Sequence, residues 1–259
     1  MISPAPSYRP IQPLTVSQRW FPKGQSFGLY EHSGRVCPNV TSILAFEKAF
    51  PFDRQKWVER EPDIDHDAVA KESAERGTAV HLALECWLSG QEHTPAEEHL
   101  PWITPLQNVL AKAAKVTRGV EIPVHHWVDG IGGYAGSCDG IVCTRRDELA
   151  IIDFKTKRPG KKVWAQYEQK NRTQLAAYSL AINAAYSNAL GGVIAKTVLL
   201  YAHPDKDKPT IIVTEGAELT AYQERWLEIL RDWYAENGAA VEQEQARFDR
   251  QRPPVVAGF

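Results

Sequence analysis

The sequence predicts an α/β protein with a mixed central β-sheet flanked by helices. In the middle of the chain, apolar β-branched runs alternate with polar turns, which is typical of consecutive antiparallel strands. Helical patterns of apolar residues lie before, between and after these strands, so helices can cover the sheet. The chain has 259 residues, 43% of them hydrophobic, which is enough to bury a sizeable core.

The composition argues against a strongly basic protein, a disulfide-rich protein and a membrane protein. The formal net charge is only -2, so any polyanionic partner would have to bind a local basic strip rather than the whole surface. Four cysteines without a CxxC motif are too sparse for a disulfide framework, and we expect reduced thiols. There is no run of 18 or more apolar residues and no charged-then-apolar leader. We therefore expect a cytoplasmic protein.

The chain divides into three predicted parts. Residues 1–37 are rich in Pro, Ser and Gly, and we expect an extended arm with a short hairpin around Phe27–Arg35, held to the body by its aromatic side chains. Residues 38–236 form one domain, and residues 237–259 form a polar tail. Within the domain, Asn39 or Thr41 can cap a helix that opens near Pro38. Further helices are expected at 68–88, 106–116, 172–187 and 219–234, with a loop at 89–101, a basic connector at 157–170, and strands at 120–128, 193–201 and 211–213.

The segment Gly136–Lys157 predicts the hairpin that organises the rest. Two apolar runs flank a polar turn, with Asp139 before the first run and Asp153 after the second. Residues two apart in a strand share a face, so Asp153 and Lys155 project together, while Phe154 points the other way. Paired residues also share a face, so Asp139 must lie opposite residue 153 or 155 to join them, and not opposite residue 154.

Two further pairs of side chains belong to helices. His81 and Glu85 are four residues apart on one predicted helix, and Gln174 and Tyr178 are four apart on another, so each pair shares a face. Gly77 interrupts the first helix at a cost of roughly 1 kcal/mol against Ala, so we expect something to approach the backbone there. Two carboxylates with an imidazole suit a divalent cation, either Mg²⁺ or Mn²⁺. Beside such a cation, a lysine can stabilise an attacking hydroxide and the charge that develops on phosphorus.

These motifs together resemble the RecB-type branch of the PD-(D/E)XK nucleases. The matching segments are Gly77-Thr78-x-x-His81-x-x-x-Glu85, Gly136-x-x-Asp139, Ile152-Asp153-Phe154-Lys155-Thr156 and Gln174-x-x-x-Tyr178. The segment Pro38-x-Val40-Thr41-x-Ile43-Leu44 is also similar to the mitochondrial genome maintenance exonuclease family and its phage relatives. The likeness covers about residues 38 to 185. The Asp-x-Lys pattern alone is weak, whereas the ordered set of motifs is specific.

The resemblance implies a restriction-endonuclease-like core and a metal-dependent DNA exonuclease that acts on single-stranded ends in replication, recombination or repair. Residues 38–77 could supply a helical arch through which a strand threads. The cysteines of the iron–sulfur relatives are missing, so no such cluster is expected. The implied metal ligands are His81, Asp139, Asp153 and the Phe154 carbonyl. Lys155 would position and activate the attacking water, Gln174 would support Lys155 or the phosphate, and Glu85 would have a supporting or second-metal role.

DNA contacts beyond this centre are expected from a basic segment with interleaved aromatics, a mixture that favours unpaired strands. The candidates are Thr41, Ser42, Lys157, Arg158, Lys162, Trp164 and Tyr178. Two other functions stay open at this point. One is a structure-specific endonuclease on the same fold, and the other is a non-catalytic DNA-binding scaffold subunit. By analogy with such nucleases, the protein would be encoded by a bacterium or a phage and could work with replication or recombination proteins.

Overall fold

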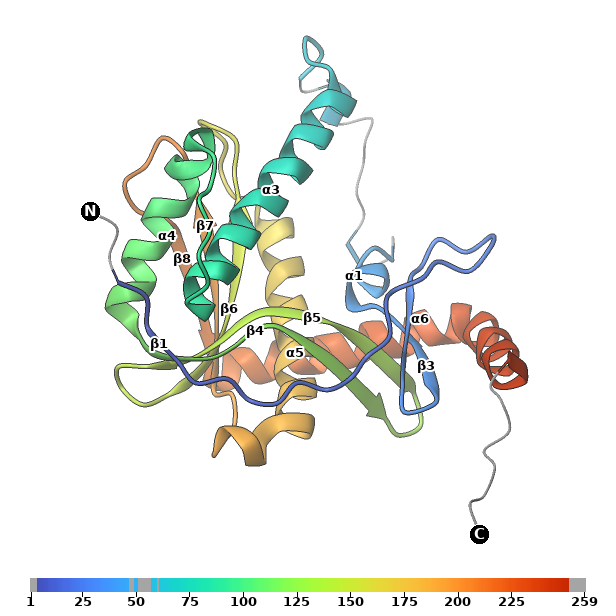
Figure 1. Cartoon of the computed structure of the whole chain (residues 1–259). Coiled ribbons are helices and arrows are strands. Elements are labelled where there is room, and N and C mark those ends of the chain that lie inside the picture. The colour runs from blue at the N-terminus through green and yellow to red at the C-terminus, as the bar shows by residue number, and fades with distance from the viewer. Residues whose placement is uncertain (1–3, 47–48, 51–56, 60, 252–259) are drawn as a thin grey trace.

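The structure is a computed structural model that describes residues 4–46, 49–50, 57–59 and 61–251. A six-stranded sheet forms its centre, in the order β1-β4-β5-β6-β7-β8 (Figure 1). The pairs β1–β4 and β6–β7 are parallel, and the other neighbours are antiparallel. The mixed sheet with flanking helices confirms the expected α/β fold. Its strands are β1 (Ser7–Tyr8), β4 (Ala114–Val128), β5 (Gly132–Thr144), β6 (Leu149–Thr156), β7 (Lys196–Ala202) and β8 (Thr210–Glu215).

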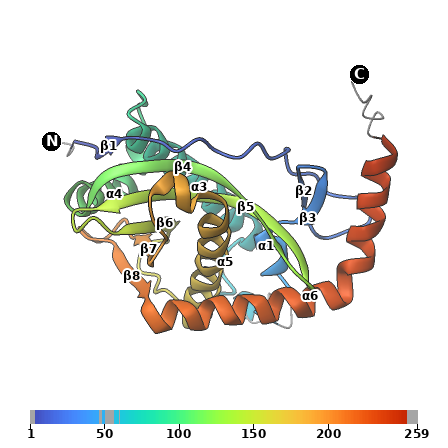
Figure 2. The same cartoon turned by 90° about the horizontal axis from the view of Figure 1, so that it is seen from below.

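Helices cover the two faces of the sheet with separate cores (Figure 2). On one face α3 (His66–Ser89) and α4 (Leu100–Ala113) pack on the strands, and Ile152 and Phe154 of β6 belong to this core. On the other face lie α5 (Ala165–Leu190) and the first half of α6 (Gly216–Gln251), and Ile151 belongs to that core. The alternation of buried residues along β6 therefore matches the expected one, and both of its faces are buried.

The hairpin between β5 and β6 has the register that the two carboxylates require. Gly140 pairs with Ile152, and Ile141 pairs with Ile151. One residue beyond the Gly140 pair, the same register places Asp139 opposite Asp153. Of the two allowed alternatives, the structure therefore selects partner 153, and Asp139 shares the face of Asp153 and Lys155.

The N-terminal arm is extended, as expected, and runs along β4 (Figure 2). It leads into the short hairpin of β2 (Leu29–His32) and β3 (Arg35–Pro38), and then into the single turn α1 (Val40–Ile43). Asn39 caps this turn, because its side chain accepts a hydrogen bond from the Ser42 backbone N–H at 3.0 Å. Phe27 meets Trp233 of α6 edge to face, with ring centroids 5.1 Å apart, so an aromatic contact holds the arm to the body.

Several predicted boundaries are wrong. Helix α4 begins at Leu100 rather than near 106, after the 3-10 turn Glu97–His99, and β4 already begins at Ala114. Pro101 suggested a loop, yet it occupies the first turn of α4, where a helix tolerates proline. Helix α5 begins at Ala165, so Tyr167 and Lys170 belong to its first turns and not to the connector.

Helix α6 extends far beyond its expected end near residue 234. It continues to Gln251, so most of the segment that we expected to be a polar tail is helical. Tertiary contacts explain the difference. The Gln245 side chain accepts a hydrogen bond from the Val36 N–H at 2.7 Å and donates one to the Gly34 carbonyl at 2.8 Å. The second half of α6 is therefore held by the β2–β3 hairpin, a partner that local sequence does not reveal.

The expected helical arch at 38–77 lies only partly within the described residues. These include α1, a short helical segment at 57–59 and the first half of α3, which projects away from the sheet (Figure 1). The arch and the three-part division of the chain stay predictions. None of the helices in the described part of the chain has the length and hydropathy to cross a membrane.

Two glycines of the recognised motifs have opposite surroundings, and this gives a stability test. A Cβ on Gly136 would lie 2.9 Å from Tyr178 Cε1, whereas a Cβ on Gly77 meets nothing within 4 Å. Overpacking should make Gly136→Ala less stable by about 1–3 kcal/mol. Gly77→Ala, within helix α3, should be more stable by up to about 1 kcal/mol. Urea unfolding measures both changes, and equal effects of the two variants would contradict the packing assigned to Gly136.

Candidate active site

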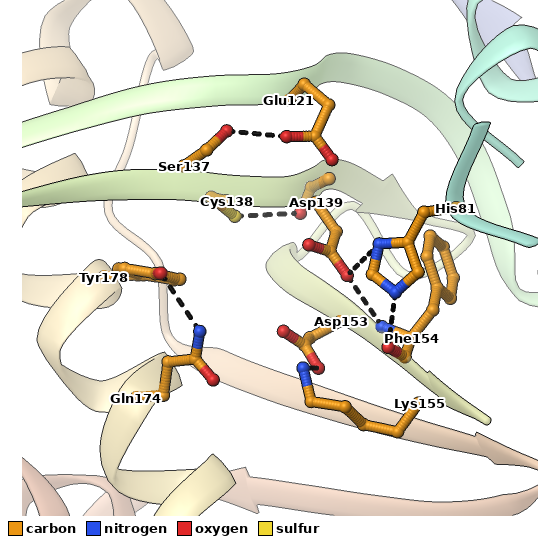
Figure 3. A network of polar contacts seen from close by, with 11 residues as sticks. His81, Glu121, Ser137, Cys138, Asp139, Asp153, Phe154, Lys155, Gln174 and Tyr178 are labelled. Atoms are coloured by element: carbon orange, nitrogen blue, oxygen red, sulfur yellow. Dashed lines mark hydrogen bonds and ion pairs between the residues drawn. The ribbon is translucent and has the colours of Figure 1, made fainter. Parts of the chain in front are cut away.

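Two carboxylates form the centre of the site. Asp139 comes from β5 and Asp153 from β6, and their side chains point toward one another in Figure 3. Asp153 is 1% exposed. The Phe154 backbone N–H donates a hydrogen bond to Asp139 Oδ2 at 2.9 Å, which fixes that side chain across the hairpin. Two like charges on neighbouring strands at a buried position destabilise each other, so the arrangement needs a compensating cation.

His81 reaches this centre from helix α3. Its Nε2 lies 2.8 Å from the Phe154 carbonyl oxygen, and its Nδ1 lies 3.4 Å from Asp139 Oδ2. A carbonyl only accepts hydrogen bonds, so Nε2 carries a proton in this contact. The expected ligand set of imidazole, carboxylates and carbonyl therefore gathers at one point, although it comes from three different elements.

Lys155 supplies a positive charge to the same centre. Its Nζ lies 2.5 Å from Asp153 Oδ2. Burial by itself would lower the pKa of Lys155, but the carboxylates of Asp153 and Asp139 outweigh burial, and the pKa is raised. Lys155 therefore keeps its proton at neutral pH. In this form it can stabilise an anion or orient a water molecule.

The pKa of Asp139 is also shifted by burial and by its neighbours. Burial, and after it the negative charge of Asp153, raises the pKa of the Asp139 carboxyl from 3.8 to about 7. The charges of His81 and Lys155 oppose this rise without cancelling it. Without a further cation, the paired carboxylates therefore retain a proton over much of the acidic range. A divalent ion would take the place of that proton.

Glu121 of β4 is a residue of the site that the sequence analysis missed. Ligand atoms of His81, Glu121 and Asp139 all lie within 4.8 Å of one another. Glu121 has a left-handed backbone, with φ of 45°, in the middle of a strand. A non-glycine residue held there costs about 1–3 kcal/mol, and such strain clusters at functional positions. The alternating segment VEIPV looked like an ordinary strand, so nothing in its pattern signalled this conformation.

The donor set fits a hard divalent cation. Donors around an octahedral Mg²⁺ with bonds of about 2.1 Å lie about 3 to 4 Å apart. The contact of His81 Nδ1 with Asp139 Oδ2, at 3.4 Å, has this spacing, and the Glu121 cluster needs only a small contraction. Carboxylate and carbonyl oxygens with a single imidazole suit Mg²⁺ or Mn²⁺ better than a softer metal. The residues that could hold the ion are His81, Glu121, Asp139, Asp153 and the Phe154 carbonyl.

Gln174 and Tyr178 approach from α5, on the opposite side from His81 (Figure 3). Gln174 Nε2 donates a hydrogen bond to the Tyr178 hydroxyl at 3.0 Å. Tyr178 is 3% exposed and packs on Gly136. The ring of Tyr178 is thus largely buried in the core, and its direct contact with DNA stays a prediction. Its hydroxyl accepts the hydrogen bond that holds Gln174 at the edge of the site.

A groove runs along α3 toward the carboxylates. It is lined by Gly77, Thr78, His81, Glu85 and Glu121, among others. Burial, and then the charge of Glu121, raises the pKa of Glu85. Apart from its chain neighbours and the backbone of its own helix, no described atom lies within 4 Å of a Cβ placed on Gly77. The close approach expected at Gly77 is thus not made by the described part of the protein, and that side of the helix is available to a ligand.

The remaining residues predicted to contact DNA lie in two separate places. Thr41 and Ser42 lie in α1, where the Ser42 hydroxyl accepts a hydrogen bond from the Gly28 N–H and the Thr41 hydroxyl accepts one from the Asn39 amide. Both hydroxyls therefore also have a local structural role. The other group gathers around one cavity beyond the end of β6, and its members are Lys157, Arg158, Lys162 and Trp164.

Comparison with known proteins identifies the family. The PD-(D/E)XK nuclease superfamily matches residues 102–253, more than half of the chain, and this range contains Glu121, both aspartates and Lys155. The chain belongs to the PD-(D/E)XK nuclease superfamily. The nuclease is also similar to the crystal structure of SSO0001, with 17% identity and a TM-score of 0.41, over 83% of this chain and 85% of that chain. No curated protein matches it.

Membership identifies the chemistry at a coarse level. The protein is a nuclease, a hydrolase whose substrate is DNA, and nucleases of this superfamily use divalent metal ions. The cluster of His81, Glu121 and Asp139 is a set of donors that could hold such an ion. The superfamily match begins after α3, so the assignment of His81 depends on the geometry described above.

The role of Glu121 can be tested with a substitution that preserves its local contact. The Ser137 hydroxyl donates to Glu121 Oε2 at 2.8 Å, and a glutamine can accept the same hydrogen bond. Glu121→Gln should weaken Mn²⁺ binding by about ten- to a hundredfold, measured by titration calorimetry, with little change in metal-free stability. Glu75→Gln removes the same charge from an exposed position of α3 outside the groove and is the matched control. An equal loss in both variants would show a general field effect instead of ligation.

The coupled carboxylates predict an unusual pH dependence of metal-free stability. An acid whose pKa is raised by folding contributes stability below its unfolded pKa, and this contribution is lost as pH rises through the folded pKa. For Asp139 that window runs from 3.8 to about 7. In EDTA, the Tm of the wild type should therefore fall more than that of Asp139→Asn from about pH 5 to about pH 8. Saturating Mn²⁺ should remove the fall. Parallel curves would contradict the shared proton.

Proposed function

We propose that this nuclease is a divalent-metal-dependent DNA exonuclease of the RecB type that acts on single-stranded ends. The observation that carries the proposal is the convergence of Asp139, Asp153, Lys155 and His81 at one point between β5, β6 and α3. The order of these residues along the chain matches the RecB-type motifs. The groove beside Gly77 gives a strand a path to that point.

Each side chain has a distinct role in the proposed hydrolysis. A bound Mg²⁺ or Mn²⁺ would lower the pKa of a coordinated water and neutralise a phosphate oxygen. Asp139, Asp153, His81 and the Phe154 carbonyl hold that ion, and Glu121 completes the set. Lys155 remains protonated, so it orients the attacking water and stabilises the negative charge that develops on phosphorus. Gln174, fixed by Tyr178, supports Lys155 or the phosphate.

Two features support single-stranded substrate. Aromatic rings at the end of β6 lie beside several cations, a combination that suits a flexible strand with unstacked bases. The carboxylates themselves are largely buried, so the scissile phosphate must enter a restricted site. A role in replication, recombination or repair belongs to the same proposal.

End-labelled oligonucleotides give the decisive experiment. A single-stranded oligonucleotide, labelled at one end or the other, is incubated with Mg²⁺, Mn²⁺ or EDTA. The wild type should shorten it only with metal. Asp153→Asn should abolish cleavage, and Lys155→Met, which keeps the aliphatic stem, should reduce it about 10²- to 10³-fold. Thermal unfolding confirms that both variants are folded.

Other outcomes point to the alternative functions. Cutting of closed circular single-stranded DNA would contradict an exonuclease and favour an endonuclease on this fold. Tight binding without cleavage of any substrate would favour the non-catalytic scaffold. Wild-type rates in Lys155→Met would remove the role assigned to Lys155.

A further inference from the structure

A cavity of about 340 Å³ lies between α3 and the segment that joins β6 to α5. Its size is at the lower end of the range for small-molecule sites. It begins where β6 ends, only two residues beyond Lys155 of the catalytic centre. Its lining is basic and aromatic, and includes Arg76, Lys157, Arg158, Lys161, Lys162, Trp164, Tyr167 and Glu61.

The charges of the lining are unbalanced. Among the lining residues that the structure describes, five are cations and one, Glu61, is a carboxylate. Arg76 is 5% exposed, and its Nη1 pairs with Glu72 Oε1 at 3.0 Å on the same helix, while its Nε has no hydrogen-bond partner among the described residues. Within the same part of the chain, Lys157 makes no ion pair, and its ammonium lies over the rings of Tyr167 and Tyr201, 5.5 Å from each centroid. Burial lowers the pKa of Lys157. Cations desolvated in this way favour an anionic ligand.

Glu61 already occupies the position of such an anion. Its Oε1 lies 2.9 Å from Lys161 Nζ, and its Oε2 lies 3.0 Å from Arg158 Nη2. The hydrogen bond from Lys161, and then that from Arg158, lowers the pKa of Glu61, so this side chain is ionised. One carboxylate bridging two cations presents two oxygens much as a phosphate does.

The aromatic part of the lining suits a base. Trp164 and Tyr167 lie side by side, with ring centroids 5.9 Å apart, and both are more than a third exposed. Stacking of a base on such a ring contributes about 1–3 kcal/mol and does not depend on sequence. A duplex presents its bases already stacked, so only an unpaired nucleotide can use these rings together with the cations.

We propose that this cavity is a nucleotide subsite, in which Glu61 holds Arg158 and Lys161 until the phosphate of an unpaired nucleotide displaces it. The proposal deepens the function proposed above and rests on it, because the occupant is the substrate strand next to the catalytic centre. Glu61 then acts as an internal competitor. It keeps the cations ordered, and it lowers the affinity for DNA by the free energy needed to break its two ion pairs.

The test is binding without cleavage. Fluorescence anisotropy in EDTA follows a labelled oligothymidylate of about 15 nucleotides over a range of NaCl concentrations. Glu61→Gln should lower the Kd about three- to tenfold at low salt. The slope of log K against log salt should change little, because Arg158 and Lys161 neutralise the same phosphate in both proteins once Glu61 is displaced. A duplex of the same length should gain little.

Glu75→Gln is the matched control, because Glu75 is 68% exposed on α3, pairs only with Lys71 at 3.9 Å and does not line the cavity. It removes the same charge and should leave the Kd nearly unchanged. A triple variant, Glu61→Gln with Arg158→Gln and Lys161→Gln, should lose the gain. Thermal unfolding verifies that each variant is folded.

Three results would overturn the subsite. Weaker or unchanged binding by Glu61→Gln would mean that Glu61 only positions its two partners. An equal gain in Glu75→Gln, or an equal gain for the duplex, would mean a general electrostatic effect. These outcomes are independent of the cleavage assay, so the subsite can fail while the nuclease activity stands, and the reverse.

Discussion

The repulsion between two buried carboxylates is the constraint on which the rest of this structure depends. Asp139 and Asp153 share one face because the β5–β6 hairpin pairs Gly140 with Ile152, and a slip by one residue would separate them. Three neighbouring groups offset their charge. Lys155 pairs with Asp153, the Phe154 N–H donates to Asp139, and the His81 ring faces Asp139. In the proposed function, a divalent cation would complete this compensation.

The two layers of the fold meet at this point. Alternation along β6 sends Phe154 toward α3 and α4, while Asp153 and Lys155 face the side of α5 and α6. The Phe154 carbonyl lies within the strand, so His81 of α3 can contact it from the other layer. Gly136 leaves room for Tyr178, which in turn holds Gln174. The site thus depends on both packed faces of the sheet, and not on one loop.

Sequence reasoning predicted what local periodicity determines. The two-residue period of the strands predicted that Asp139 and Asp153 share one face of the sheet. The four-residue spacing predicted that His81 and Glu85 share one face of their helix. Sequence reasoning failed where tertiary contacts or backbone strain determine the conformation or the length of an element. The left-handed Glu121 stands in an ordinary strand pattern, and the extension of α6 depends on the contact of Gln245 with the β2–β3 hairpin. Tyr178 could be assigned to the core only once its surroundings were known.

The carboxylate centre and the cavity beyond β6 are similar in their electrostatics, but the charges have opposite signs. At the centre, the ammonium of Lys155 compensates Asp153, and in the cavity the carboxylate of Glu61 compensates Arg158 and Lys161. In each case a side chain of the protein supplies the charge that a ligand also brings. Binding of metal or of a phosphate is then an exchange of partners, so its net free energy is the difference between two strong interactions. Such an exchange makes the affinity depend on how well the ligand's geometry improves on that of the internal partner.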